Sequence, residues 1–403
     1  MPSANDDRAT ATALLSAAAV RERCAIVFTA AERGEARHFR LDLHRLGEAA
    51  DRVAALTRRR YPDLAVPYHS RWRHFCVGGV DRAALVAADG DAAERVRARI
   101  DLAVLSVLLD AGAGQGWRYR EAETGQIWGR SEGLAVASLR AMQHGLFAVD
   151  SKAPWRADAA ALADIRPRSL AAAFQHDPGN RLLGIDNRAA LLRRLGECCA
   201  ADPGRFGTPA RPGHLFDYWR ARGKDLPAAE ILSTLLLALA PIWPARFSLG
   251  GVPLGDCGRH SAVSRDGFVP FHKLSQWLAY SLVEPLEAAD MQVSGLDRLT
   301  GLAEYRNGGL FLDCGVIRPR DPHLLSRPLA ATSEAVVEWR ALTVALLDRL
   351  APAVRARLGK SAQEFPLACV LEGGSWAAGR DIALERRPDG SPPITIVSDG
   401  TLF

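Results

Sequence analysis

Apolar residues recur every three to four positions along most of this 403-residue sequence, and that period restricts the fold more than any other feature. Segment 42–60 shows it clearly, because its apolar side chains would line one face of an α-helix. Segments 91–112, 187–200 and 333–359 follow the same spacing. The spacing predicts a mainly α-helical protein. The apolar face of segment 42–60 consists of Leu43, Leu46, Ala50, Val53 and Leu56.

Strand signals are sparse, and they predict minor β hairpins at two places. One is segment 24–43, "CAIVFTAAERGEARHFRLDL". The other is the tail, where "DIALERR" (381–387) and "PITIVSDGTLF" (393–403) flank the turn-rich "PDGSPP". The sequence contains no internal repeat and no low-complexity linker. We therefore expect residues 1–403 to form a single compact catalytic unit, with a possible sub-boundary near 150–160.

Charge and hydropathy argue against nucleic-acid and membrane partners. The formal net charge is only +5 and is spread along the chain, so a basic groove for nucleic acid is not expected. The most apolar run, Ile231 to Trp243, is well short of the roughly 20 residues that a membrane helix needs. It predicts a buried core helix ended by Pro241 and Pro244. The acidic start of the chain lacks the basic region of a signal peptide, which predicts a cytoplasmic protein.

Cofactor and metal motifs are missing from the sequence. The seven cysteines are irregularly spaced, and no Cys–His cluster has zinc-site spacing, so a reduced interior without a metal site is expected. The glycine-rich "SLGGVPLGD" lacks the Lys-Ser/Thr of a phosphate-binding P-loop, and no GxGxxG follows a strand. We expect no cofactor.

Five stretches combine glycine, aromatic and polar residues more densely than the helical segments do. Binding residues concentrate in loops held by a rigid scaffold, so five such stretches in a helical chain predict one shared cavity. Taken singly, each could equally be structural. The stretches are 66–79, 128–135, 248–260, 299–315 and 371–380.

Lys273 is unusual in this sequence, because only four of the 51 basic residues are lysines. The pattern predicts a helix from Pro270, ended or kinked at Pro285. A surface lysine is the ordinary interpretation. The neighbours His272 and Gln276 are not typical solvent-facing partners, which favours a cation in a cavity. The predicted helix face consists of Lys273, Gln276, Trp277, Tyr280 and Glu284.

The stretch "AEYRNGGLFLD" supplies the opposite charge. Glu304 and Arg306 flank Tyr305, and segment 307–309 (Asn-Gly-Gly) predicts a break where the backbone can approach a ligand. The alternative is a turn closed by a Glu304–Arg306 ion pair.

Four of these motifs together resemble the uracil catabolism protein 4 family: "GGVPLGD", "DGFVPFHKLSQWLAYSLVEPL", "LTGLAEYRNGGLFLDCGVI" and "LEGGSWAAGR". With "PYHSRWRHF" and "GRSEGLA", the resemblance covers most of the chain. It implies a role in a ring-opening route of uracil breakdown. In that route a ribosylurea-type intermediate must be cleaved to free urea.

A more distant resemblance is to queuosine-phosphate N-glycosidases, which carry motifs similar to "FHKLSQWL", "LTGLAEYRNGG" and the Trp-containing "EGGSWA" in the same order. It implies a helical core like that of helix-hairpin-helix DNA glycosylases. Lys273 and Gln276 match the lysine and glutamine of that family's helix. Glu304 matches its catalytic aspartate, and Tyr305 and Arg306 follow. The sequence departs from the family in having Glu rather than Asp, and Asn-Gly where those proteins have an apolar-Pro pair.

The two resemblances converge on an N-glycosidase-type hydrolase that cleaves the C1′–N bond of ribosylurea or its 5′-phosphate to release urea. A carboxylate beneath C1′ would stabilise an oxocarbenium-like transition state or attack it. Lys273 and Arg306 would hold Glu304 ionised, because opposite charge lowers the pKa of a carboxyl group, or would clamp the phosphate. The hypothesis assigns catalysis to Glu304, Lys273 and Asp313, and substrate binding to Arg306, Tyr305, Gln276, Trp277, His69, Arg71, Asp256, His260 and Trp376.

The leaving urea needs a proton, and four candidate donors are unranked: His69, His260, Asp256 and Asp313. The competing interpretation is a non-enzymatic regulator of the pathway that binds a phospho-sugar or nucleotide. Such a regulator would need the basic clamp without a carboxylate beside it. Either interpretation makes the partner a small molecule and leaves the oligomeric state open.

Overall fold

The computed structural model describes residues 4–114, 116–243, 246–264 and 266–397, which fall into two compact units. Of the described residues, the first unit comprises 4–69, 246–264, 266–276 and 295–397, and the second comprises 70–114, 116–243 and 277–294. The prediction of a single catalytic unit with a sub-boundary near 150–160 is not tested by this division and stays a prediction.

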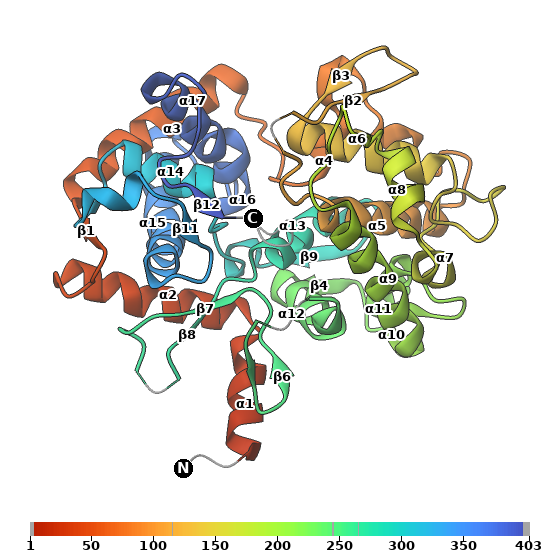
Figure 1. Ribbon diagram of the computed structural model, residues 1–403, viewed down its shortest axis with the longest axis horizontal. Helices are drawn as coiled ribbons and strands as arrows, with labels where there is room; N and C mark the ends of the chain where they lie inside the picture. Colours follow the sequence, from red (N-terminus) through yellow and green to blue (C-terminus); the bar gives the residue numbers. More distant parts are fainter. Residues whose placement is uncertain (1–3, 115, 244–245, 265, 398–403) are drawn as a thin grey trace. The chain divides into compact units, whose positions relative to one another are not determined.

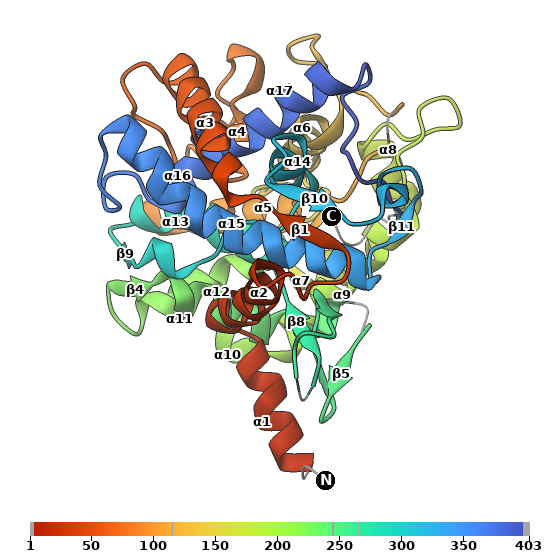
Figure 2. The ribbon, with the colours of Figure 1, turned by 90° about the vertical axis from the view of Figure 1, so that its left-hand side faces the viewer.

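The first unit is built on the long helix α15 (Glu334–Leu358), which is buried along most of its length. Helices α2 (Ala17–Glu32) and α3 (Leu46–Arg60) pack against it (Figure 2). The hydroxyl of Ser16 accepts the N–H of Ala19 and caps the start of α2. Gly359 adopts a left-handed φ of 69° and ends α15.

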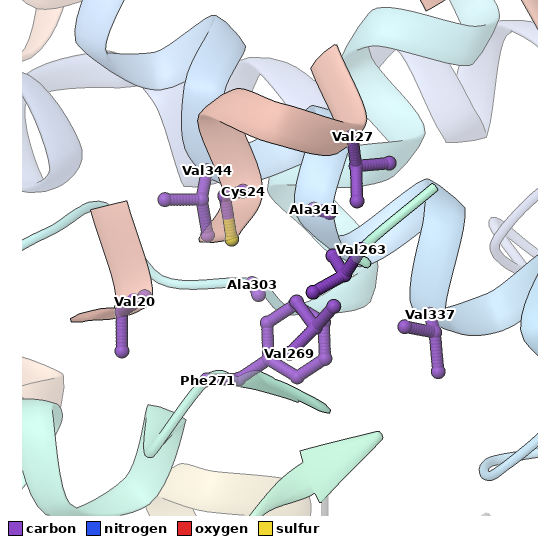
Figure 3. Close-up of a cluster of buried hydrophobic side chains, with 10 residues drawn as sticks. All are labelled: Val20, Cys24, Val27, Val263, Val269, Phe271, Ala303, Val337, Ala341 and Val344. Atoms are coloured by element: carbon purple, nitrogen blue, oxygen red, sulfur yellow. The ribbon is translucent and has the colours of Figure 1, made fainter. Parts of the chain in front are cut away.

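A cluster of buried side chains joins α2, α15 and the strand β8 (Phe268–Pro270) (Figure 3). Phe271 and Ala303 belong to the cluster and immediately precede the two segments that carry Lys273 and Glu304. Burying a valine or phenylalanine side chain contributes roughly 1.5–3 kcal/mol. The core therefore anchors both candidate site segments. Its members are Val20, Cys24, Val27, Val263, Val269, Phe271, Ala303, Val337, Ala341 and Val344.

Helices α14 (Tyr305–Asp313) and α17 (Trp376–Arg386) pack closely in the same unit. A Cβ at Gly379 would lie 2.0 Å from the carbonyl oxygen of Arg306, so only glycine permits this approach. Before α17, the chain forms α16 (Leu367–Val370) and then a π-helix over Leu371–Ser375. The first unit also contains α1 (Ala4–Leu14).

The second unit is helical as well, with α5 (Ala92–Leu108) packed against α6 (Arg130–Gln143) and α11 (Leu215–Arg220) (Figure 1). The helix α13 (Lys273–Glu287) begins in the first unit and has most of its residues in the second. The remaining helices are α4 (Trp72–Phe75), α7 (Ala159–Ala163), α8 (Pro167–Ala173), α9 (Ile185–Ala201), α10 (Pro203–Phe206) and α12 (Ala228–Ala238).

Strands occur only in short pairs within the described ranges. The antiparallel pairs are β1 (Phe39–Leu41) with β10 (Ile317–Pro319), β2 (Tyr119–Arg120) with β3 (Ile127–Trp128), β5 (Ser248–Leu249) with β6 (Val252–Pro253), and β7 (Cys257–Arg259) with β8. The parallel pairs are β4 (Asp225–Pro227) with β9 (Gln292–Ser294), and β11 (Leu329–Ala330) with β12 (Ile396–Val397). The prediction of a mainly α protein with minor β is confirmed. The likeness to a helix-hairpin-helix core stays a prediction.

Both predicted hairpins are wrong. Residues 24–32 continue α2, because their apolar side chains repeat at helical spacing and pack into the core; in the rest of segment 24–43, only Phe39–Leu41 is a strand. Residues 381–386 of the tail belong to α17, and Ile396–Val397 pairs with β11 instead. Residues 398–403 of the second predicted strand lie outside the described residues.

The predicted helix boundaries around Lys273 and Glu304 also need correction. Pro270 is the last residue of β8, and α13 starts at Lys273. Pro285 lies inside α13, which continues to Glu287. Segment 307–309 is not a break but part of α14, because a glycine at 308 lets this helix pack against the indole of Trp339.

The apolar run from Ile231 forms the buried helix α12, which ends at Ala238 and is followed by a 3₁₀ turn containing Pro241, as predicted. Pro244 lies outside the described residues. In the described part of the chain, we find no helix with the length and apolar character needed to span a membrane.

Candidate active site

The start of α13 is fixed by a buried ion pair, and this places Lys273. Asp256 Oδ2 accepts the backbone N–H of Lys273 at 3.0 Å. Arg340 of α15 donates to both oxygens of Asp256, at 2.7 and 2.8 Å. Burial alone would raise the pKa of Asp256, but the charge and hydrogen bonds of Arg340 outweigh it and lower this pKa to about 2. Asp256 is therefore an anionic cap for α13.

The residue before Lys273 has an unusual backbone. His272 has a φ of 49°, in the left-handed region that residues other than glycine rarely adopt. Its ring is buried, and Nε2 lies 2.9 Å from the carbonyl oxygen of Leu14. Such backbone conformations persist where the surroundings hold them, often at functional sites. The anchored turn directs the half-buried side chain of Lys273, which is not a solvent-exposed surface residue.

Glu304 is the N-cap of α14, and its carboxylate is held by that helix. Oε2 accepts the N–H of Arg306 and Oε1 accepts the N–H of Asn307, each at 2.6 Å. The residue is only 8% exposed. Ser, Thr, Asp and Asn are the residues favoured at this position, and glutamate is not among them. Capping alone therefore does not explain why a glutamate stands here.

The charge state of Glu304 is a balance between burial and its neighbours. Burial raises its pKa, while the two backbone N–H groups and the positive charges of Lys273 and His69 lower it, and the net direction is upward. We expected nearby cations to lower this pKa overall. The effect of Lys273 is as expected, but burial exceeds it.

Arg306 acts on Glu304 through its backbone N–H, while its guanidinium Nη1 donates to the carbonyl oxygen of Gly390 at 2.8 Å. The alternative of a turn closed by a Glu304–Arg306 ion pair therefore does not describe this site.

A second carboxylate, Glu372, lies in the π-helix and binds His69. Its Oε2 is 2.9 Å from His69 Nδ1, and its Oε1 accepts hydrogen bonds from Arg60 and from the hydroxyl of Tyr61. Arg60 also donates to the Glu372 carbonyl oxygen, at 2.7 Å. A side chain at Gly374 would collide with the carbonyl oxygen of Val53, at 2.6 Å, so glycine lets the π-helix lie against α3. Short π-helical turns occur frequently at functional sites.

The sequence did not single out Glu372, although "LEGGSWAAGR" was among the five selected stretches. Its partners Arg60, Tyr61 and His69 come from a segment about three hundred positions earlier. The available signal was a glutamate immediately before a Gly-Gly pair, since two glycines in a helix indicate close backbone packing.

Gln276 links the two segments of the site. Its Oε1 accepts the N–H of Thr300 at 2.8 Å, and its Nε2 donates to the Phe271 carbonyl oxygen at 3.1 Å and to the Thr300 hydroxyl. Thr300 precedes Glu304 by four residues. The amide thus ties the start of α13 to the loop that carries Glu304. Its predicted role in substrate binding stays a prediction.

Asp313 and His260 are held by other partners. Asp313 is at the opposite end of α14 from Glu304, roughly 13 Å along the helix axis, and accepts both hydrogen bonds of Arg387 at 2.8 and 2.6 Å. His260 Nε2 lies 3.0 Å from Glu338 Oε2, and its Nδ1 accepts the N–H of Ala262. The hypothesis below leaves both residues out.

Residues 13–403 match the model of a protein family described as "Protein of unknown function (DUF1688)". The chain belongs to this family. It is similar to "Protein urg3" of Schizosaccharomyces pombe (strain 972 / ATCC 24843), with 40% identity over 405 residues that cover 98% of this chain and 99% of that protein. It is also similar to "Uracil catabolism protein 4" of Lachancea kluyveri, with 37% identity over 432 residues that cover 96% and 98%. The predicted resemblance to the uracil catabolism protein 4 family is thereby confirmed.

Two of the predicted binding residues, Arg71 and Trp277, lie in the second unit. Arg71 is fully buried, donates from Nε to Ser106 Oγ at 2.7 Å, and lies 2.9 Å from Asp110. Its guanidinium carbon is 5.5 Å from the ring centre of Trp277. Their substrate-binding roles stay predictions.

Tyr305 and Trp376, both in the first unit, are the first residues of α14 and α17, and each ring lies near an arginine, Arg306 and Arg380 respectively. Among the described residues, no group of three or more His, Cys, Asp or Glu side chains is arranged to hold a metal ion.

The Asp256–Arg340 pair should contribute measurably to stability. We expect Asp256→Asn to lower the free energy of unfolding by about 3 kcal/mol at pH 7, because it leaves Arg340 largely buried without its anion. Since the folded-state pKa of Asp256 is lowered from 3.8 to about 2, its contribution is present above pH 4 and is lost as pH falls through about 2. Urea denaturation at pH 7, 4 and 2 should therefore show a shrinking difference between variant and wild type.

A matched control is Asp266→Asn, which breaks another two-bond arginine pair of the same unit, with Arg23, away from α13. It should lower stability without changing any activity that depends on Lys273. An Asp256→Asn variant as stable as wild type at pH 7 would contradict the capping role.

Proposed function

We propose that this protein is an N-glycosidase-type hydrolase of uracil catabolism that cleaves the C1′–N bond of ribosylurea or its 5′-phosphate to release urea. Two findings support the proposal. One relative is named for uracil catabolism, and it matches this chain over nearly its full length. The first unit holds the buried carboxylate of Glu304, whose ionised form the charge of Lys273 favours, and this suits a reaction that develops positive charge.

The proposed mechanism centres on positive charge at C1′. Breaking a C1′–N bond passes through an oxocarbenium-like state, which a carboxylate stabilises when it is fixed in a site with little water. Glu304 has that placement, because two backbone N–H groups orient its oxygens and its side chain is buried. The carboxylate of Glu304 therefore needs little movement as positive charge develops at C1′.

Glu304 also suits the activation of water. A carboxylate whose pKa is raised by burial accepts a proton more readily than an exposed one. It must still be ionised at neutral pH before the reaction, and Lys273 favours that state by lowering the same pKa. In this mechanism, Glu304 takes the proton of the water that attacks C1′, while Lys273 keeps the resting carboxylate charged.

The single observation that carries the proposal is the buried, helix-held carboxylate of Glu304 within electrostatic range of Lys273. A binding protein for phospho-sugars gains nothing from an anion there, because the anion would repel a phosphate. Because the proposed reaction cleaves the C1′–N bond of ribosylurea or its 5′-phosphate, the proposed partner is a small molecule.

The test is to incubate the purified protein with ribosylurea and with its 5′-phosphate separately and to measure urea. We expect urea from at least one of them without an added cofactor. If the protein binds either compound but releases no urea, the hydrolase proposal is wrong and the regulator interpretation is favoured.

A further inference from the structure

The structure separates the four candidate proton donors for the leaving urea. Asp256 and Asp313 each accept two hydrogen bonds from an arginine, which stabilises the carboxylate without a proton. His260 is hydrogen-bonded through both ring nitrogens, to Glu338 and to Ala262. His69 is different, because its partner Glu372 lies in the π-helix that packs against α14, the helix that Glu304 caps.

We infer that His69, oriented by Glu372, donates the proton that lets urea leave, and this inference rests on the proposed function. His69 lies on the segment directly after α3, where its own backbone N–H donates to the Ala368 carbonyl oxygen at 3.1 Å. Its side chain is 14% exposed and that of Glu372 is 9% exposed, so the pair is largely screened from water. His69 is the proposed catalytic residue, and Glu372 is the positioning residue.

Glu372 performs two tasks for the imidazole. Its Oε2 accepts the Nδ1–H of His69 at 2.9 Å, which fixes the orientation of the ring; in the proposed step the proton on Nε2 is the one transferred. Its negative charge also stabilises the imidazolium form. Arg60 and Tyr61 hold the other oxygen, Oε1, so the carboxylate cannot rotate away from the ring.

The proton and electron balance of the step is complete with water as the only co-substrate. The C1′–N bond breaks, its electron pair goes to the urea nitrogen, and that nitrogen takes the Nε2 proton of His69. The oxygen of water bonds to C1′, and the water proton passes to the carboxylate of Glu304. Return of that proton from Glu304 to His69 through solvent restores both groups.

The arrangement predicts that kcat/KM falls as the pH is lowered through the pKa of Glu304. The acid limb reports Glu304, which must be ionised, and its raised pKa places this limb above the range of an ordinary glutamate. The charged and titratable groups that act on His69 or Glu304 include Glu372, which binds His69, and Lys273, which acts on Glu304. Arg60 and Tyr61 bind Glu372 in turn.

The test compares two leaving groups on the same sugar. Urea must be protonated to leave, whereas 4-nitrophenolate leaves without a proton. Both substrates are used in the phosphorylation state that wild type prefers. For His69→Gln we expect kcat to fall by about 10²-fold or more with ribosylurea. With the 4-nitrophenyl riboside, the same variant should lose less than about threefold in kcat. Glu372→Gln should lower kcat about tenfold with ribosylurea and by less than about threefold with the 4-nitrophenyl riboside, because the imidazole is no longer held in position to protonate urea.

His38→Gln is the matched control, since it removes another histidine–glutamate pair of the first unit, in which His38 Nε2 lies 3.6 Å from Glu334 Oε2. It should change neither substrate's kcat by more than about threefold. Equal losses on both substrates in His69→Gln, or no loss on either, would overturn the inference while leaving the hydrolase proposal intact. Wild-type protein that releases no urea would overturn both.

Discussion

Glu304→Gln should lower kcat for urea release by about 10³-fold, the scale of removing one preorganised electrostatic partner from a developing charge. Glutamine keeps the size of the side chain but removes the negative charge that faces C1′ and the group that accepts the water proton. KM should change little, because the loss falls on the transition state rather than on substrate binding. Steady-state urea assays with the preferred substrate measure both parameters.

The structure adds a stability effect to this variant. The carboxylate caps α14 with two oxygens, whereas glutamine offers one oxygen to two N–H groups, so we expect a loss of about 1 kcal/mol. Ser16→Ala is the matched control, since it removes the N-cap of α2 in the same unit and should cost about the same stability with full activity. Glu304→Asp should restore the cap and recover only part of the activity, because its carboxylate is withdrawn by one methylene.

Turnover in Glu304→Gln within about tenfold of wild type would contradict the assigned role. In that case the carboxylate would be a helix cap only, and Ser16→Ala and Glu304→Gln would behave alike in every assay.

The helices were predictable because the spacing of apolar residues within each segment is enough to indicate a helix. Apolar spacing in segments 42–60 and 333–359 placed α3 and α15 closely. Strands β1 and β11 were not predictable, because β1 pairs with β10 and β11 with β12 across long sequence separations. A short strand is stabilised by its partner rather than by its own residues. The hairpin expected over segment 24–43 is wrong for a different reason, since residues 24–32 belong to α2.

The charged residues of the candidate site were predictable from the sequence, but their burial and their contacts with distant residues were not. Lys273 stood out because lysine is scarce in the sequence, and Glu304 stood out because it matches the catalytic aspartate of the queuosine-phosphate N-glycosidases. Burial of Glu304, which reverses the expected direction of its pKa shift, depends on packing that no local pattern encodes. Glu372 was missed because a long separation in sequence hides its contact with His69.

Arg306 shows why proximity in sequence misleads. It follows Glu304 by two positions, and residues two apart on a helix do not face each other. Because Glu304 caps α14, the side chain of Arg306 leaves the helix in another direction and reaches Gly390. The second cation for Glu304 comes instead from His69, far away in the chain.

Lys273→Arg should lower kcat/KM for urea release by about 10²-fold although the charge is kept. Lysine is a compact point charge on a flexible stem, and a planar guanidinium of greater length does not occupy the same position beside Glu304. Lys224→Arg is the matched control, because Lys224 forms an exposed ion pair with Asp290 in the second unit. It should leave urea release unchanged.

Comparing Lys273→Met with Lys273→Arg distinguishes the effect of the positive charge of Lys273 from the effect of its side-chain shape. The positive charge of Lys273 lowers the pKa of Glu304, so removing it should raise that pKa further and move the acid limb of the kcat/KM profile to higher pH. Lys273→Arg should lose activity with a smaller displacement of that limb, since a positive charge remains nearby. If both variants keep wild-type rates and the same pH profile, the lysine contributes surface charge alone, and the pairing with Glu304 on which the hydrolase mechanism depends is wrong.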